Sequence, residues 1–589
     1  MAAPSGVATA SSFGMKKIVP WLIYAAALLC LSACVYAELL ADFDGRVFAD
    51  NDDSSLFIWW IAHTADVVAG WFGRTTGGGS LLYTTAMNAP VGVNGAWNTS
   101  LVGIGLPLVP VTWIFGPVVS YNVAIVCAPV VSALTAALLI RRFTRLVPAF
   151  FGGALYGFST YTIAQSSGHL NLAWAVFPPL VVLMMVLVAH DRRWTVTFGI
   201  VLGWQFYIST ELLAGTFLAV LVFSAGACLT AWPHVRPFLV AVVLRGSIAV
   251  GTALVIASPL LFTMWFAPNG PRDSIRPHGV WNTDVLDVMT PGPYTRIGTG
   301  RELPRVEPID PSELGGYLSI LWLVVCLAAV VLVWKRSPAA RTAACTGFGM
   351  WALSLGSPIF LGGEQLLPYG PFRLVELIPV LSNILPMRLM VHVVLACSVL
   401  SALLLNSARR VSSRALIGTA LSGVLVLTSA APVPARDLHI PEFYTDQVRD
   451  AIPAGALVKP LPRPRAWAYP RADEAMLWQA VSGMHYRETG GYFIGGRDDA
   501  PVTYAAAADS LDILLEEHRD SPVPRAEDLR GGVRELCRGG VDYILIADDG
   551  FYLPQPAPDI ARAVGAAAGV SPQHTGGVWM IKLSKEQGC

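Results

Sequence analysis

A cluster of aspartates follows the first apolar segment of the chain: Asp42, Asp44, Asp50, Asp52 and Asp53. Carboxylates crowded into one loop repel each other and lose hydration, which raises a carboxyl pKa toward the working range of a general base. The same oxygen ligands suit a divalent cation such as Mg²⁺ or Mn²⁺. The residue types fit a solvated acidic loop equally well, with Asp52, Asp53 or Ser54 capping the next helix.

Aromatic residues follow the aspartates directly. Trp59, Trp60 and Trp71, with His63 among them, are typical of anchors at a membrane–water interface. We therefore expect this segment to hold the aspartates against the outer leaflet, where a carboxylate can meet a lipid-linked substrate.

The elements that position these residues are mostly apolar. Of 589 residues, 54% are hydrophobic and 14% are charged, against about 25% charged in a typical soluble domain. The 40 basic and 40 acidic residues cancel to a net charge of +0, which argues against a nucleic-acid partner. Since no P-loop, G-x-S-x-G elbow or C-x-x-C pair is present, the sequence predicts no nucleotide cofactor.

About eleven apolar stretches approach the ~20 residues that cross a hydrocarbon core. They are 18–40, 119–140, 147–164, 170–190, 195–210, 212–231, 238–265, 315–334, 342–361, 389–407 and 415–432. The run 195–232 is too long for one crossing, so it is predicted to turn at Ser209-Thr210-Glu211. Residues 101–115, interrupted by two prolines, are predicted to form an outer-surface or re-entrant segment.

Short basic clusters predict the orientation. With the N-terminus inside, after Lys16 and Lys17, every short Arg- and Lys-rich loop falls on the cytoplasmic side. The sequence therefore predicts a multi-pass plasma-membrane protein with residues 1–17 in the cytoplasm and 18–432 as its membrane domain. The large segments left outside are 41–118, 266–314 and 433–589.

The C-terminal segment is long enough for a core of its own. The β-rich runs 543–546 and 578–581, with Ala/Glu/Arg-rich stretches between them, predict a small extracytoplasmic α/β domain. Cys537 and Cys589 can pair there if the compartment is oxidising. Its polar loops hold residues that suit a glycan acceptor: Arg463, Arg465, Tyr492, Arg497, Asp498 and Asp499.

The order of several motifs carries a family resemblance. The motifs are Asp53-Ser54-Ser55-Leu56-Phe57-Ile58-Trp59-Trp60, Asn88-Ala89-Pro90-Val91-Gly92, Phe115-Gly116-Pro117 with Tyr121-Asn122, Gly168-His169-Leu170-Asn171, Gln205 with Ser209-Thr210-Glu211, Glu313-Leu314-Gly315-Gly316-Tyr317, Leu385-Pro386-Met387-Arg388, and Trp478-Gln479 with Gly490-Gly491-Tyr492. Over most of its length the chain resembles bacterial multi-spanning glycosyltransferases of the C class (GT-C fold), and it looks closest to actinobacterial members.

The resemblance implies an α-helical polytopic fold and an enzyme that transfers a hexosyl or pentosyl unit. The donor would be a polyprenyl-phosphate sugar, and the acceptor an envelope glycan or glycolipid outside the cytoplasm. A first-loop aspartate is the base in such enzymes, so Asp53 is the first candidate and Asp52 the second. Family members often have Pro after this aspartate, whereas Ser54 follows here, and the choice of base stays open. Asp42 and Asp44 are candidate substrate contacts.

Inverting transfer needs a carboxylate that takes the proton of the acceptor hydroxyl, and a cation that holds the departing phosphate. Arg388, at the predicted outer end of a span, is the candidate cation because its planar fork suits two phosphate oxygens. The alternative is an interfacial arginine whose head reaches toward water.

Other polar residues are expected at the same outer face. Glu211 is a candidate for contact with a substrate hydroxyl or a metal, or for a local hydrogen bond within the turn. His169 opens a span and is either a substrate contact or structural. Glu313 and Tyr317 enter another span and are expected to line the same cavity, with helix capping as the alternative for Glu313.

Two other functional classes remain. A transporter or flippase of lipid-linked glycans would bury ionisable residues near the bilayer midplane and show paired halves, whereas the interior spans here are nearly free of charge. A non-catalytic envelope-assembly partner would retain the fold without clustered carboxylates.

Overall fold

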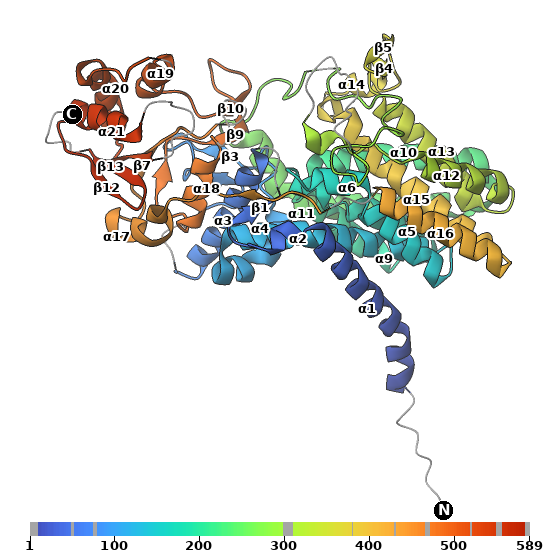
Figure 1. Cartoon of the computed structure of the whole chain (residues 1–589). Coiled ribbons are helices and arrows are strands. Elements are labelled where there is room, and N and C mark those ends of the chain that lie inside the picture. The colour runs from blue at the N-terminus through green and yellow to red at the C-terminus, as the bar shows by residue number, and fades with distance from the viewer. Residues whose placement is uncertain are drawn as a thin grey trace, which may run out of the picture.

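The computed structural model describes residues 10–48, 52–74, 79–277, 279–298, 310–379, 381–428, 432–465, 472–518, 521–548 and 556–583. Asp50 of the aspartate cluster and Cys589 lie outside the described residues. The chain has a helical part, which ends at Thr428, followed by a smaller α/β part (Figure 1).

The helical part contains helices of very different length. They are α1 (Ala10–Val35), α2 (Ala37–Leu40), α3 (Asp53–Trp71), α4 (Val102–Ile140), α5 (Leu146–Gly157), α6 (Thr160–Gln165), α7 (Leu170–Ala173), α8 (Phe177–His190), α9 (Trp194–Phe206), α10 (Thr210–Val235), α11 (Leu239–Phe266), α12 (Ile320–Val333), α13 (Pro338–Ser354), α14 (Arg373–Glu376), α15 (Met390–Ser407) and α16 (Val411–Thr428). Short 3₁₀ turns are η1 (Arg236–Phe238), η2 (Pro311–Glu313), η3 (Leu381–Asn383) and η4 (Pro386–Leu389). Two small hairpins pair β2 (Tyr83–Thr84) with β3 (Val93–Asn94) and β4 (Ile359–Leu361) with β5 (Glu364–Leu367).

Six helical segments of the described chain are long and apolar enough to cross a membrane. They are Ile18–Val35, Val102–Ile140, Leu170–His190, Thr210–Phe266, Pro386–Ser407 and Val411–Thr428. α1 extends away from the other helices (Figure 1) and exposes Leu22 and Ile23, as a lipid-facing helix would. The predicted fold class, a helical domain with membrane-type spans followed by an α/β domain, is confirmed, while the orientation across the membrane stays a prediction.

Two predicted spans are broken within the protein. Residues 147–164 divide into α5 and α6, and residues 170–190 divide into α7 and α8. Pro178 and Pro179 occupy the first turn of α8, where a missing N–H costs no helical hydrogen bond. The breaks create helix ends inside the molecule, where polar side chains find backbone partners.

The structure also settles the local geometry of two other segments. α9 ends at Phe206 and α10 begins at Thr210, with the Ser209 hydroxyl accepting a hydrogen bond from the Leu212 N–H at 3.1 Å. The predicted turn is therefore confirmed. Residues 102–115 are helical, but Gly116 (φ 86°, ψ 168°) interrupts α4 and separates them from the following helix.

The α/β part is built around a mixed sheet. Its helices are η5 (Phe443–Gln447, a π-helical turn), α17 (Val448–Ala451), α18 (Glu474–Val481), α19 (Ser510–Glu517), α20 (Ala526–Arg538) and α21 (Ala557–Ala568), and its strands are β6 (Arg436–Asp437), β7 (Leu457–Leu461), β8 (Arg487–Glu488), β9 (Tyr492–Gly495), β10 (Thr503–Ala505), β11 (Tyr543–Ala547), β12 (Gln573–Thr575) and β13 (Val578–Lys582). Five strands pair in the order β12-β13-β11-β7-β8, with β11 parallel to β7 and antiparallel to β13. The two runs predicted to be strands thus pair with each other. Cys537 in α20 is disulfide-bonded.

The two parts of the chain are joined through α3, which packs against α18. β1 (Arg46–Val47) pairs with β6, and the Trp59 indole N–H donates to Gln479 Oε1 at 2.5 Å. The prediction that Trp59 and Trp60 are interfacial anchors is wrong. Both are fully buried, because α3 packs against α4 and α18 and the indoles belong to the apolar core formed there.

The buried Lys459 gives a test of the α/β part. Its ammonium lies in β7, 2.6 Å from Asp509 Oδ2 and 2.5 Å from Asp512 Oδ2. Lys459→Met removes the nearest cation of buried Asp512, which keeps only Arg463 Nε at 3.6 Å. We therefore expect the domain to lose about 3–5 kcal/mol of stability. Pulse proteolysis of the full chain in detergent measures this loss. Arg525→Gln, which removes an exposed pair with Glu527, should cost less than about 1 kcal/mol; similar losses in both variants would contradict the prediction.

Candidate functional site

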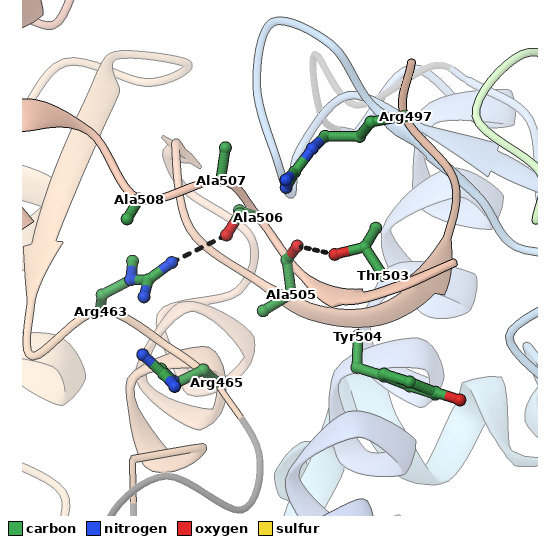
Figure 2. A pocket seen from close by; sticks show the side chains of 9 residues that line it. All are labelled: Arg463, Arg465, Arg497, Thr503, Tyr504, Ala505, Ala506, Ala507 and Ala508. Atoms are coloured by element: carbon green, nitrogen blue, oxygen red, sulfur yellow. Dashed lines mark hydrogen bonds between the residues drawn. The ribbon is translucent and has the colours of Figure 1, made fainter. Parts of the chain in front are cut away.

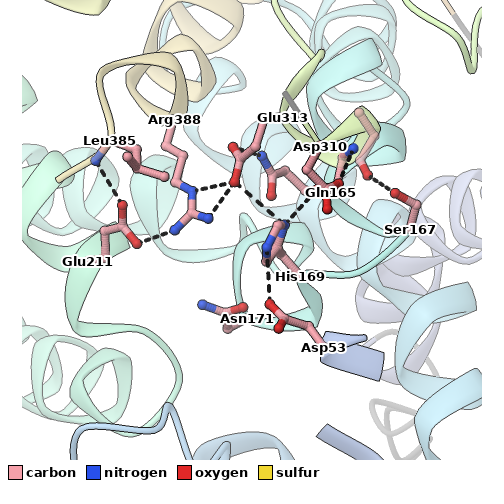
Figure 3. Close-up of polar contacts among 12 residues, drawn as sticks. Asp53, Gln165, Ser167, His169, Asn171, Glu211, Asp310, Glu313, Leu385 and Arg388 are labelled. Atoms are coloured by element: carbon pink, nitrogen blue, oxygen red, sulfur yellow. Dashed lines mark hydrogen bonds and ion pairs between the residues drawn. The ribbon is translucent and has the colours of Figure 1, made fainter. Parts of the chain in front are cut away.

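Five charged side chains of alternating sign form a continuous chain of contacts where the helical part meets the α/β part (Figure 3). We call Asp53, His169, Glu313, Arg388 and Glu211 the ion-pair chain. His169 Nε2 lies 3.2 Å from Asp53 Oδ2, and its Nδ1 lies 3.7 Å from Glu313 Oε1. Arg388 binds Glu313 Oε1 through Nε at 2.9 Å and through Nη2, and it contacts Glu211 through Nη1. Charged residues that are far apart in the sequence are therefore in direct electrostatic contact.

Helix ends position every member of the ion-pair chain. Asp53 is the first residue of α3 and Glu211 lies in the first turn of α10, so both carboxylates sit where the helix dipole favours a negative charge. His169 precedes α7, Glu313 ends η2, and Arg388 lies in η4 just before α15.

Burial makes the pairing at Glu313 obligatory, because its side chain has 0% exposure and that of Arg388 has 6%. Burial alone would raise the pKa of Glu313, but the charges of Arg388 and His169 lower it to about 2. Gln165 Nε2 donates a further hydrogen bond to Glu313 Oε2 at 3.0 Å. Arg388 is therefore a buried partner of two carboxylates, and the alternative of an interfacial arginine reaching toward water does not hold.

Asp53 has a partner on each oxygen. Besides His169, the Tyr492 hydroxyl donates to Oδ1 at 2.5 Å. Burial alone would raise the pKa of Asp53, but these two hydrogen bonds and the charge of Arg388 lower it below its usual value. Asp53 is consequently an ionised acceptor at neutral pH, with 21% of its side chain exposed.

His169 is the cation between two carboxylates. Burial alone would lower its pKa, but the hydrogen bond to Asp53 and the charge of Glu313 raise it above the usual value. Its Nδ1 also lies 3.0 Å from Ser312 Oγ. Both ring nitrogens thus face oxygen atoms, which suits a protonated imidazole.

Asp52 faces a different set of residues. Asp473 is fully buried and accepts a hydrogen bond from Ser55, and Arg436 lies 3.9 Å away. Burial and the nearby charge of Asp52 raise the pKa of Asp473 to about 8. Asp52 thus acts on Asp473, whereas its neighbour Asp53 binds His169 and Tyr492.

Arg276 extends the ion-pair chain beyond Glu211. Its Nη2 lies 3.8 Å from Glu211 Oε2, and its guanidinium lies over the Trp281 ring at 5.7 Å. A quarter of the side chain is exposed, and within the described residues its Nη1 has no hydrogen-bond partner. Leu385 N–H occupies the other oxygen of Glu211 at 3.0 Å.

Three sequence-predicted contacts are not joined to the ion-pair chain. Asp42 and Asp44 are exposed, and Asp42 accepts a hydrogen bond from Gly45 N–H at 3.2 Å. Tyr317 is buried and offers its backbone carbonyl to Thr160 at 2.6 Å. No polar contact among the described residues links the Tyr317 hydroxyl to the ion-pair chain.

The sequence suggested Tyr492 as an acceptor-binding residue of the C-terminal domain but not as a partner of Asp53, and it gave no role to Arg276. Tyr492 follows Gly491, whose φ of 149° and close contact with Met87 exclude a side chain. The Gly-Gly-Tyr motif was therefore a usable signal. Arg276 lies in an irregular loop with no motif around it.

No group of three or more His, Cys, Asp or Glu side chains in the described part of the chain is arranged to hold a metal ion. Asp53 and Glu313 are paired with cationic side chains instead. The predicted divalent cation stays a prediction.

No protein-family model matches this chain, and no curated protein is significantly similar to it in sequence. Solved structures of the Archaeoglobus fulgidus oligosaccharyltransferase show a weak overall likeness. The form tethered to an acceptor peptide with the NVT sequon has a TM-score of 0.44 and 10% identity, covering 89% of this chain and 69% of that one. The AglB complex with an inhibitory peptide and dolichol-phosphate has a TM-score of 0.43 and 11% identity, with the same coverage.

The raised pKa of His169 predicts how stability depends on pH. A histidine whose pKa is raised by folding stabilises the folded protein fully at pH values below its pKa in the unfolded chain, about 6.5. This stabilisation is lost as the pH rises through the pKa of the folded protein. His169→Gln should therefore lower the thermal midpoint most at about pH 6, where the imidazole is protonated, and least at about pH 9, where it has lost the proton. The exposed His190→Gln is the control; a His169→Gln deficit that grows toward alkaline pH would contradict the assignment.

Proposed function

We propose that this chain is a GT-C-type inverting glycosyltransferase. It moves a sugar from a polyprenyl-phosphate donor to an envelope glycan or glycolipid acceptor at the outer face of the membrane. The observation that carries the proposal is an ionised, partly exposed aspartate held by His169 and Tyr492 beside helices of membrane-spanning length.

Asp53 is the proposed base. A glycosyl transition state has oxocarbenium character, so the acceptor hydroxyl becomes strongly acidic as its oxygen joins the anomeric carbon. A carboxylate with a lowered pKa is then basic enough to take the proton. Its hydrogen bonds from His169 and Tyr492 fix its direction, and the attack on the face opposite the phosphate inverts the anomeric centre.

The leaving phosphate needs positive charge, and two arginines supply it. The Arg276 side chain is a quarter exposed, and its buried Nη1 has no hydrogen-bond partner in the described chain. Arg388, whose N–H groups bind Glu313 and Glu211, contributes its charge and keeps the carboxylates in place. We therefore assign direct phosphate contact first to Arg276 and second to Arg388.

The clustered carboxylates support an enzyme over the other classes. A non-catalytic assembly partner has no need for an aspartate poised between a histidine and a tyrosine. The ion-pair chain is in contact with the α/β part through the Tyr492 hydroxyl on Asp53, whereas the substrate sites of transporters lie near the bilayer midplane.

Replacing the base tests the proposal. Asp53→Asn should reduce transfer from a polyprenyl-phosphate sugar to envelope acceptors by about 10²–10⁴-fold, because the proton has no acceptor. Asp52→Asn should lose less, since Asp52 faces Asp473 instead. Radiolabelled sugar transfer in membranes, at matched protein level, gives both rates.

The surface variant Asp559→Asn is the control for these rates, since Asp559 pairs with Arg562 on α21. Full activity in Asp53→Asn would exclude Asp53 as the base. Loss confined to Asp52→Asn would transfer that role to Asp52.

Arg276→Gln tests the phosphate contact. Removing a charge-assisted hydrogen bond of about 1.5–3 kcal/mol should weaken donor use by roughly 10–100-fold. The effect should be seen as a raised KM for the polyprenyl-phosphate sugar with a smaller change for the acceptor. Arg272→Gln, which removes an exposed arginine paired with Asp498, should leave both unchanged. Equal effects of the two variants would contradict the assignment.

A further inference from the structure

A second cationic site lies in the α/β part, outside the ion-pair chain. A cavity of about 280 Å³ is lined by Arg463, Arg465, Arg497, Tyr504 and the neighbouring backbone of residues 503–508 (Figure 2). This volume is near the lower end of the roughly 300–1,000 Å³ of small-molecule sites. It suits one saccharide unit.

The charge that faces this cavity is positive. None of its lining residues is acidic. Arg463 and Arg465 share one carboxylate, Glu516, at 3.2 and 3.3 Å, while Asp512 is bound by Lys459. The Arg463 side chain is 7% exposed, and its Nε faces Asp512 Oδ2 at 3.6 Å without a hydrogen bond. The paired carboxylates are not among the residues that line the cavity, so an oxyanion there would meet three guanidinium groups and no acidic side chain.

The remaining wall suits a sugar. The half-buried Tyr504 ring lines the cavity together with the small alanine side chains at 505–508, of which Ala507 and Ala508 lie near Arg463 (Figure 2). Arg463 Nη1 donates to the Ala506 carbonyl at 2.8 Å, which fixes this backbone against the arginine. A flat apolar face next to forked donors is an arrangement that binds an acidic saccharide.

One hairpin connects this cavity to the ion-pair chain. β9 carries Tyr492, whose hydroxyl binds Asp53, and β10 carries Tyr504, which lines the cavity. The Tyr504 hydroxyl donates to the carbonyl of Ile275, the residue before Arg276. A ligand in the cavity would thus lie against the element that also orients the proposed base.

We propose that this cavity binds an acidic saccharide unit of the acceptor. Carboxylate or phosphate oxygens of that unit contact Arg497, Arg465 and Arg463, and its ring packs on Tyr504. That this saccharide belongs to the acceptor rests on the proposed transferase function. The binding of an acidic saccharide does not depend on that function.

Isothermal titration calorimetry of the full chain in detergent tests the site without any transfer reaction. Trigalacturonate should bind the wild type and Asp53→Asn equally, and maltotriose, its neutral counterpart, should not bind detectably. Arg497→Gln should weaken trigalacturonate binding by about 10-fold or more. Arg497 pairs with exposed Asp499 at 3.0 Å, so its removal spares the core. Tighter binding of glucose 6-phosphate than of trigalacturonate would indicate a phosphate-bearing unit, and the reverse a carboxylate-bearing unit. Binding of either sugar that depends on Arg497 supports the site.

Arg272→Gln is the matched control, because this arginine belongs to the neighbouring surface but does not line the cavity. The proposal is overturned if neither acidic sugar binds, if Arg272→Gln and Arg497→Gln lose affinity equally, or if inorganic phosphate alone binds as tightly as the acidic sugars. Loss of transfer in the Asp53 variant bears on the proposed function only. Intact trigalacturonate binding by that variant keeps the two questions separate.

Discussion

Burial of the Glu313 carboxylate is the constraint on which the rest of the site depends. An isolated carboxylate without solvent costs several kcal/mol in protein interiors, so Arg388 must accompany it, and the buried guanidinium in turn needs Glu211. On the other side His169 carries positive charge between Glu313 and Asp53. Charges therefore alternate from the buried Glu313 to two partly exposed ends, Asp53 and Arg276. In the proposed function, these two groups contact the substrate.

The same constraint explains the interruptions in the helical part. A continuous apolar helix offers no backbone donors for a carboxylate, whereas a helix end does. Glu211 accepts the Leu385 N–H ahead of η4, and Asp53 and Glu211 each begin a helix. Breaking long apolar runs at these points places charged residues at protein-lined ends. The apolar surface of the spans stays free for lipid.

Local pattern predicted the elements and several of the site residues, but not their partners. The turn at Ser209 and the strands β11 and β13 follow from capping and β-rich composition, and the structure brings Asp53, His169, Glu211, Glu313 and Arg388 into one cluster. The misjudged burial of Trp59 has a different cause. Its cover, α18, lies about 420 residues further along, and no local pattern predicts which surface will close over a helix. Tyr492 reaches Asp53 across a similar separation.

In the proposed function, the ion-pair chain presents an ionised aspartate and an arginine to one substrate. The most direct measurement is an experimental structure of the full chain with a bound polyprenyl phosphate. If Asp53 is the base, the phosphate should lie against Arg276, with its prenyl tail along the apolar helices and Asp53 facing the position of the anomeric carbon. A phosphate bound elsewhere, with Asp53 closed off behind His169 and Tyr492, would contradict it.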